Sequence, residues 1–259
     1  MKAKDFILQL EKDYPVEYAL EWDNVGLLIG NKEKEIHKVY IALDVTEEEL
    51  KQAIEEGADM IITHHPLLIQ PIKRITGESF LTRMIIKLLQ QDILCYTMHT
   101  NYDVLRMGRL ASTMLGLQAT QPLERLEHRK ENVGIGELGM LESPITLQAC
   151  AQLVKDKFEL NEVKIFGDLN QRVHKIAITP GSGKSTIPAA IAKGADVLVT
   201  GDIGHHEGLD ALEEGLMIID AGHYGTEYMF IADMKEYLQE NFTQIQVGTH
   251  PISHPFCII

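Results

Sequence analysis

One stretch of this chain occurs twice, and that duplication constrains the fold more than any other feature of the sequence. Residues 53–63 read AIEEGADMIIT, and residues 190–200 read AIAKGADVLVT. Each copy has the pattern of a helix end, a Gly-Ala-Asp turn and a short apolar strand. Strands and helices alternate over the rest of the chain as well. The sequence therefore predicts an α/β protein made of two related halves, with mixed sheets flanked by helices.

Histidines and carboxylates follow the expected strands in both halves. A histidine pair comes after each copied strand, and a His-x-x-x-carboxylate pattern comes after a later apolar run in each half. Ligand sites of α/β sheets lie where strands end, and imidazole mixed with carboxylate suits Zn, Mn, Fe or Ni. We therefore expect a metal site shared between the halves. The pattern alone makes the following residues equal candidates for metal ligands: His64, His65, His99, Asp103, His205, His206, His223 and Glu227.

Composition narrows the class of protein. With 259 residues and 45% hydrophobic content, the chain can bury a sizeable core. The net charge of −14 disfavours nucleic acid and anionic membranes as partners. Cys95, Cys150 and Cys257 have unrelated spacings, which indicates free buried thiols rather than a disulfide framework. The N-terminal residues lack the apolar core of a signal peptide, so we expect a cytoplasmic protein.

Local signals place the elements and the boundary between the halves. Thr46 and Glu49 form a capping box that begins a helix after the strand at residues 39–43, which predicts a β-α-β unit. The stretch 121–131 is charged and has no strand pattern, and residues 133–141 have the pattern of an edge strand. We therefore expect a first half at 1–125, to which the C-terminal tail can belong, and a second half at 126–259.

The chain resembles a family of hexameric, dinuclear-metal proteins related to the yeast NGG-interacting factor three, many of them named GTP cyclohydrolase I type 2 homologues. The matching segments occur in the family's order over nearly the whole length. They are residues 22–27 (WDNVGL), 63–66 (THHP), 99–103 (HTNYD), 200–202 (TGD), 205–206 (HH) and 220–227 (DAGHYGTE).

The resemblance implies a division of labour among the nominated residues. Two divalent ions (Zn, Mn, Fe or Ni) would be held by five ligands, with Glu227 bridging the ions. His99 and His205 would orient ligands or substrate and carry protons, as catalytic residues. The implied ligands are His64, His65, Asp103, His223 and Glu227.

Three functions are compatible with such a site. The resemblance implies a hydrolase in which metal-activated water attacks the purine imidazole ring of GTP. A two-metal phosphoesterase is the second, and a metal-holding scaffold or regulator with protein partners is the third. The resemblance also implies a homohexamer, arranged as three dimers, with a small nucleotide as its substrate.

Several other residues have competing interpretations. The segment 180–186 (PGSGKST) suggests a phosphate-binding loop, but Ile178 occupies the position where that motif requires glycine. Lys184 could still touch an anionic ligand. Trp22, the only tryptophan, could stack on a base or pack in the core. Asp44 could support a metal ligand or simply form a turn. His250 and His254 lie in a proline-rich tail that we expect to be exposed.

Overall fold

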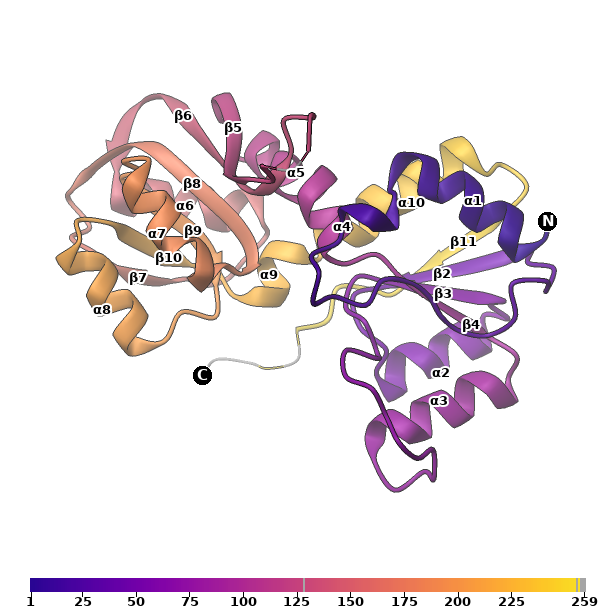
Figure 1. Cartoon of the computed structure of the whole chain (residues 1–259). Helices are drawn as coiled ribbons and strands as arrows, with labels where there is room; N and C mark the ends of the chain where they lie inside the picture. The colour runs from indigo at the N-terminus through magenta and orange to yellow at the C-terminus, as the bar shows by residue number, and fades with distance from the viewer. Residues whose placement is uncertain (128, 255, 257–259) are drawn as a thin grey trace. The chain divides into compact units, whose positions relative to one another are not determined.

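The computed structural model describes residues 1–127, 129–254 and 256, and these residues form two compact units. The first unit comprises residues 1–102 and 228–253. The second comprises residues 103–227 and the described residues from 254 onward. Each unit contains one sheet with helices on its faces (Figure 1). The predicted α/β class with mixed sheets is therefore confirmed.

The sheet of the first unit has five strands in the order β1-β4-β3-β2-β11. The last four in this order are parallel to one another, whereas β1 pairs with β4 in the antiparallel direction. The strands are β1 (Gly26–Ile29), β2 (Lys38–Ala42), β3 (Met60–Thr63), β4 (Leu94–Thr97) and β11 (Gln246–Thr249). The helices are α1 (Ala3–Asp13), a 3₁₀ turn (Val16–Tyr18), α2 (Glu47–Glu55), α3 (Phe80–Gln90), α4 (Thr100–Tyr102) and α10 (Met229–Asn241).

Both faces of this sheet are covered, which explains why its parallel strands are continuous apolar runs rather than alternating ones. Tyr40, Ile61 and Cys95 belong to the core cluster that includes apolar residues of α2 and α3. Helices α1 and α10 lie on the other side of the sheet (Figure 1). The predicted capping box begins α2, because the Thr46 hydroxyl accepts from the backbone N–H of Glu49 while the Glu49 carboxylate accepts from that of Thr46.

The sheet of the second unit has six strands in the order β5-β6-β8-β9-β10-β7. Strands β8, β9 and β10 are parallel, and the other pairings are antiparallel. The strands are β5 (Gln118–Arg125), β6 (Gly134–Thr146), β7 (Lys164–Phe166), β8 (Arg172–Ser182), β9 (Val197–Gly201) and β10 (Met217–Asp220). The helical elements are a π-helical turn (Asp103–Met107), α5 (Gly108–Met114), α6 (Leu147–Lys157), a 3₁₀ turn (Gly183–Thr186), α7 (Ile187–Ala192), α8 (His205–Glu213) and α9 (His223–Glu227).

The duplication seen in the sequence is repeated in the hydrogen bonding of the two sheets. In each unit an antiparallel edge strand, β1 in the first and β7 in the second, lies next to a run of three parallel strands, which β11 extends to four in the first unit. The aspartate of the Gly-Ala-Asp turn has the same role in both copies. One carboxylate oxygen of Asp59 accepts from the two backbone N–H groups at residues 37–38, and one of Asp196 accepts from those at 174–175. In both copies the bonded N–H groups directly precede the first residue that pairs with the next parallel strand, Val39 in β2 and Ile176 in β8.

Two local expectations are wrong. The sequence predicts no strand in the stretch 121–131, but its first five residues belong to β5 because they pair with β6. Strand β6 itself lies between β5 and β8, so it is not an edge strand. The spatial units also change at Tyr102, ahead of the expected division at 125/126, because α5 and β5 pack within the second unit. The tail adds β11 to the first sheet by pairing with β2.

Two other features bear on the class of protein. None of the helices in the described part of the chain is long and apolar enough to cross a membrane. Cys95 and Cys150 are buried free thiols, as predicted, and Cys257 lies outside the described residues.

Candidate metal centre

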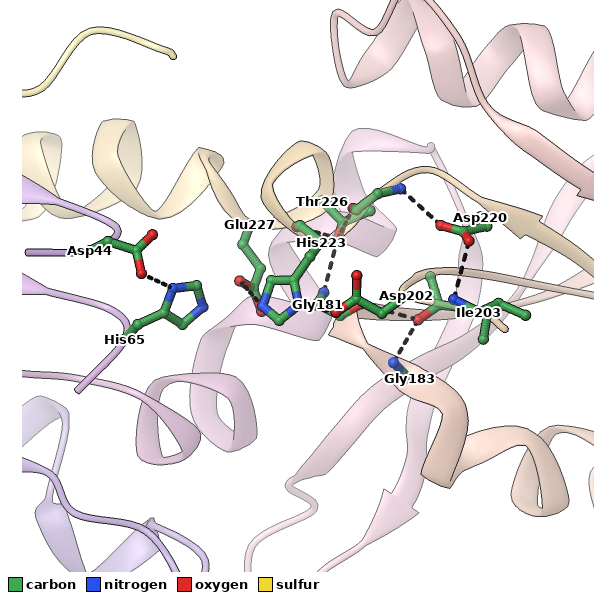
Figure 2. Close-up of polar contacts among 12 residues, drawn as sticks. Asp44, His65, Gly181, Gly183, Asp202, Ile203, Asp220, His223, Thr226 and Glu227 are labelled. Carbon is green, nitrogen blue, oxygen red and sulfur yellow. Dashed lines mark hydrogen bonds and ion pairs between the residues drawn. The ribbon is translucent and has the colours of Figure 1, made fainter. Parts of the chain in front are cut away.

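The first unit supplies the predicted histidine pair directly after β3. His64 is fully buried, and its Nδ1 lies 2.8 Å from the carbonyl oxygen of Met98. A carbonyl only accepts hydrogen bonds, so Nδ1 carries the proton and the lone pair for a metal is on Nε2. His65 is held in the same way, with Nδ1 2.9 Å from a carboxylate oxygen of Asp44 (Figure 2). Both rings are thereby oriented through Nδ1.

His99 joins these two histidines within the first unit. Its ring centroid lies 5.2 Å from that of His64 and 5.8 Å from that of His65. One ring nitrogen from each of the three residues lies within 4.8 Å of the other two. Such spacing is compatible with donors that converge on metal ions or on a ligand beside them. The structure therefore brings His99 into the group, as the duplication suggested.

Asp23 fixes the orientation of His99. One of its carboxylate oxygens lies 2.9 Å from His99 Nδ1, and the other accepts hydrogen bonds from the backbone N–H and the hydroxyl of Thr100. Burial raises the pKa of Asp23, but the hydrogen bonds from His99 and Thr100 and the charge interaction with His99 outweigh burial and lower the pKa to about 2. Asp23 is therefore ionised at neutral pH and acts only as an acceptor.

The second unit supplies a histidine and a carboxylate from one turn of α9. His223 Nε2 lies 3.0 Å from an oxygen of Glu227, and His223 Nδ1 lies 2.7 Å from an oxygen of Asp202 (Figure 2). A neutral imidazole has one N–H and can donate to only one carboxylate. Because the His223 ring faces a carboxylate at each nitrogen, the second contact requires either a second proton on the ring or a metal ion bound between the ring and the carboxylate. Two donor atoms that each lie about 2.1 Å from one metal ion, at a right angle to each other, are roughly 3 Å apart. The 3.0 Å between His223 Nε2 and the Glu227 oxygen matches this spacing.

Asp103 contributes another carboxylate to the second unit. It begins the π-helical turn Asp103–Met107, and such turns often occur at functional sites. One of its oxygens lies within 4.8 Å of an oxygen of Glu227, whose side chain is buried. Two neighbouring carboxylates repel each other when both are ionised, and a cation relieves that repulsion. The second unit therefore offers Asp103, His223 and Glu227 as donors.

Hydrogen bonds to the Asp220 carboxylate hold the two loops that carry Asp202 and His223. At the end of β10, its carboxylate accepts from the backbone N–H groups of Ile203 and Gly222, each at 3.1 Å (Figure 2). These donors directly follow Asp202 and directly precede His223. Asp220 therefore sets the spacing of the loops that bring the Asp202 carboxylate to the His223 ring.

The Gly-Ser-Gly turn makes room for Glu227 and does not have the motif of a phosphate-binding loop. Gly181 has a backbone φ of +71°, and a Cβ built there would lie 2.0 Å from Glu227 Oε1. Its N–H donates to the hydroxyl of Thr226 at 2.9 Å (Figure 2). Glycine is thus required by both conformation and space. Lys184 follows in the 3₁₀ turn and is exposed.

The remaining predicted residues lie elsewhere. His205 and His206 are exposed at the start of α8, with ring centroids 5.3 Å apart. Neither belongs to a group of potential metal donors within the described part of the chain. The expectation that His250 is exposed is wrong: it is 7% exposed and its Nδ1 lies 3.3 Å from the Tyr40 hydroxyl, because β11 carries it against β2. His254 is exposed, as expected.

The roles of Asp23 and Asp202 were not predicted from the sequence, although both residues lie in the family motifs at 22–27 and 200–202. The duplication contained a signal for Asp202. Aligning residues 53–63 with 190–200 places Asp202 opposite His65, so each copy has a polar side chain two residues after its repeated threonine. Asp202 also has a left-handed backbone, with φ +58°, a conformation that aspartate adopts more readily than most residues. No comparable repeat marks Asp23.

These features define an α/β protein with two sets of potential metal donors, which are three histidines in the first unit and a histidine with two carboxylates in the second. The chain belongs to the Duf34/NIF3 (NGG1p interacting factor 3) family, whose model matches residues 1–255. A Clostridium perfringens protein named GTP cyclohydrolase 1 type 2 homolog is 38% identical over 243 residues, which cover 93% of this chain and 92% of that protein.

Solved structures agree over the full length. A hypothetical protein from Staphylococcus aureus is similar with a TM-score of 0.92 and 31% identity, covering 100% of this chain and 99% of that one. A Bacillus cereus protein related to NIF3 has a TM-score of 0.91 and 26% identity, with the same coverage. The resemblance stated from the sequence motifs is therefore confirmed.

Proposed function

We propose that the two donor sets act together and bind two divalent metal ions per chain. The observation that carries this proposal is the shared orientation of the histidines. A carbonyl or carboxylate holds Nδ1 of His64, His65 and His223, which directs the Nε2 lone pair towards a metal. Metal-binding histidines are almost always held by such a second hydrogen bond. The proposed ligands are His64, His65, Asp103, His223 and Glu227, with Glu227 bridging the ions.

The chemistry of these donors fits a transition metal. Imidazole with carboxylate suits Zn, Mn, Fe or Ni, whereas a site for Mg or Ca would be built from oxygen donors. Five protein ligands exceed the four of one tetrahedral ion. A buried, bridging carboxylate would also neutralise part of the charge of two ions, which supports a dinuclear centre.

We propose further that the protein is a hydrolase of the GTP cyclohydrolase type 2 kind. Divalent ions at the centre would supply Lewis-acid activation of water and of substrate atoms. His99 would carry the proton removed from the attacking water on Nε2, because Asp23 holds the opposite ring nitrogen. His205 would exchange a second proton with solvent, in keeping with its exposure at the start of α8. The names of the relatives support the purine nucleotide as substrate.

Assembly and location complete the proposal. The family resemblance supports a homohexamer arranged as three dimers. The buried free thiols of Cys95 and Cys150 support activity in the reducing cytoplasm.

A metal-reconstituted assay tests the proposed reaction. Purified protein loaded separately with Zn, Mn, Fe or Ni would be incubated with GTP and with a generic phosphodiester. We expect water to open the guanine imidazole ring of GTP, seen as a change in guanine absorbance, and His99→Ala to lower the rate by about 100-fold or more. Cleavage of the phosphodiester alone would replace this proposal with a two-metal phosphoesterase. If the protein is inactive towards both substrates with every one of the four metals, a metal-holding scaffold would replace the proposed hydrolase.

A further inference from the structure

Trp22 is the only tryptophan of the chain, and 60% of its surface is exposed. It lies in the loop that precedes β1, next to Asp23. Tryptophan is highly buried on average because its ring has a large apolar area. An indole left so exposed is either incidental or placed to meet another molecule, and the structure around it decides between these two explanations.

The loop that carries Trp22 is held firmly on both sides. Before it, the backbone N–H of Leu20 donates to the hydroxyl of Thr100 at 2.9 Å. After it, the buried carboxylate of Asp23 accepts from the backbone N–H of Thr100 at 3.0 Å and holds His99 Nδ1 at 2.9 Å. These hydrogen bonds all reach the segment that carries His99. The loop is therefore held in place by bonds within the protein, and such preorganisation reduces the entropic cost of binding.

The indole of Trp22 lies beside the histidines of the first unit, which are His64, His65 and His99. The ring centroids of Trp22 and His99 are 5.9 Å apart with an interplanar angle of 78°, an edge-to-face arrangement. His99 in turn contacts the rings of His64 and His65. A planar group packed on the exposed indole would thus lie next to the residue proposed to move protons.

We propose that Trp22 is a stacking platform for the purine base of the substrate. This inference rests on the proposed function and names the part of the nucleotide that the protein recognises. A purine is flat and apolar on its faces, so it matches an indole surface, and stacking on an aromatic side chain contributes roughly tenfold to hundredfold in affinity. The stack would anchor the base, while the hydrogen bonds that Asp23 accepts from His99 and Thr100 keep the platform and His99 in fixed relation.

The single tryptophan makes a direct measurement possible, because the intrinsic fluorescence excited at the red edge reports on Trp22 alone. The metal-loaded protein would be titrated with guanosine monophosphate, with ribose 5-phosphate as the probe that lacks a base. We expect saturable quenching by guanosine monophosphate only. By calorimetry, Trp22→Leu should weaken its binding by about tenfold or more, and Trp22→Phe by less. Phe80→Leu is the matched control, since Phe80 is another exposed aromatic residue, 44% exposed, on α3.

The possible outcomes separate this inference from the proposed function. Saturable quenching without turnover of GTP would support the platform and remove the hydrolase. Turnover of GTP with an unchanged KM in Trp22→Leu would overturn the platform and leave the hydrolase intact. Equal affinity of wild type and Trp22→Leu for guanosine monophosphate would also overturn it. If Trp22→Leu changes only the number of chains per particle, Trp22 is an assembly contact and the platform is rejected.

Discussion

At the scale of single residues, the site is organised by the acceptors that hold Nδ1 of its histidines. A main-chain carbonyl holds His64, and carboxylates of Asp44, Asp23 and Asp202 hold His65, His99 and His223. Each acceptor selects the tautomer whose lone pair is on Nε2. His205 has no such acceptor among the hydrogen bonds of the described residues, so it differs from the proposed ligands in its surroundings as well as in its exposure.

This difference predicts unequal effects on metal binding. Glu227→Gln should reduce metal affinity by more than 100-fold, because the amide lacks the charge that neutralises the ions. His205→Ala should change it by about tenfold or less, as expected for a residue outside the ligand set. Metal content after dialysis against a graded chelator measures both. Equal losses in the two variants would show that His205 binds metal.

A second residue-scale prediction concerns Glu137 of β6. Its side chain is 5% exposed, Oε1 lies 3.7 Å from Arg109 Nε, and Oε2 has no hydrogen-bond partner within the described part of the chain. Burial raises the pKa of Glu137, and the charges of Arg109 and Lys193 offset only part of that effect. The folded protein therefore binds this proton more tightly than the unfolded chain does. Protonation of Glu137 therefore stabilises the folded state relative to the unfolded chain. This stabilisation is complete below the ordinary glutamate pKa of about 4.3 and is lost as pH rises through the raised pKa of the folded protein.

Glu137→Gln removes this titration. We expect the variant to gain stability relative to wild type as pH rises from about 4 to 8, by an amount on the order of 1 kcal/mol, the size of the penalty for a poorly paired buried group. Urea unfolding at a series of pH values gives the difference directly. A difference that stays constant over this range would contradict the role given to burial.

At the scale of secondary-structure elements, the elements of the repeat are the ones that could be predicted from the sequence. The β2-α2-β3 unit and its copy follow from apolar strands, a capping box and the Gly-Ala-Asp turn, which are local in sequence. Strand β5 could not be predicted, because its residues become a strand only through pairing with β6. The burial of His250 likewise depends on β11 reaching β2, more than 200 residues away in sequence.

The residues of the candidate site also divide into those that could be predicted from the sequence and those that depend on contacts between distant parts of the chain. The histidines and carboxylates of the candidate site could be predicted, because they recur after strands in both halves. Their supports could not all be predicted, because Asp23 is 76 residues from the histidine that it holds and belongs to no repeat. The space that Gly181 leaves for the Glu227 carboxylate could not be predicted either, because these two residues approach each other only in the folded chain.

That close approach gives a prediction with a matched control. Gly181 and Gly194 have φ values of +71° and +65°, so alanine at either position should cost about 1 kcal/mol of stability from backbone strain. Only at Gly181 would the new Cβ displace the Glu227 carboxylate; at Gly194 the atom nearest to the new Cβ would be Lys175 Nζ, at 4.0 Å.

We therefore expect Gly181→Ala to lose metal affinity by at least tenfold, and Gly194→Ala to keep it. Thermal unfolding and chelator competition on both variants separate strain from ligand displacement. Equal metal affinity in the two variants would mean that Glu227 tolerates the added methyl group and that Gly181 is required for its backbone conformation alone.

At the scale of the whole molecule, the two units are copies of one plan with different complements of donors. The first supplies histidines alone, and the second supplies a histidine with two carboxylates. A net charge of −14 on each chain would multiply in an oligomer, so an anionic nucleotide would depend on the metal ions for attraction.

The proposed hexamer is a prediction at this scale. Closed symmetry is the usual form of soluble oligomers, and the family resemblance implies six copies. Light scattering at micromolar concentration should give about six chains per particle, with no change on adding metal chelator if assembly is independent of the site. A stable monomer or dimer would contradict the hexamer.

The most direct test of the central proposal is the metal content of the purified, reconstituted protein. The donors of the two units predict about two divalent ions per chain by elemental analysis, falling below one per chain in Glu227→Gln under the same dialysis. Well under one ion per chain in the wild-type protein, with its thermal unfolding intact, would contradict the dinuclear centre.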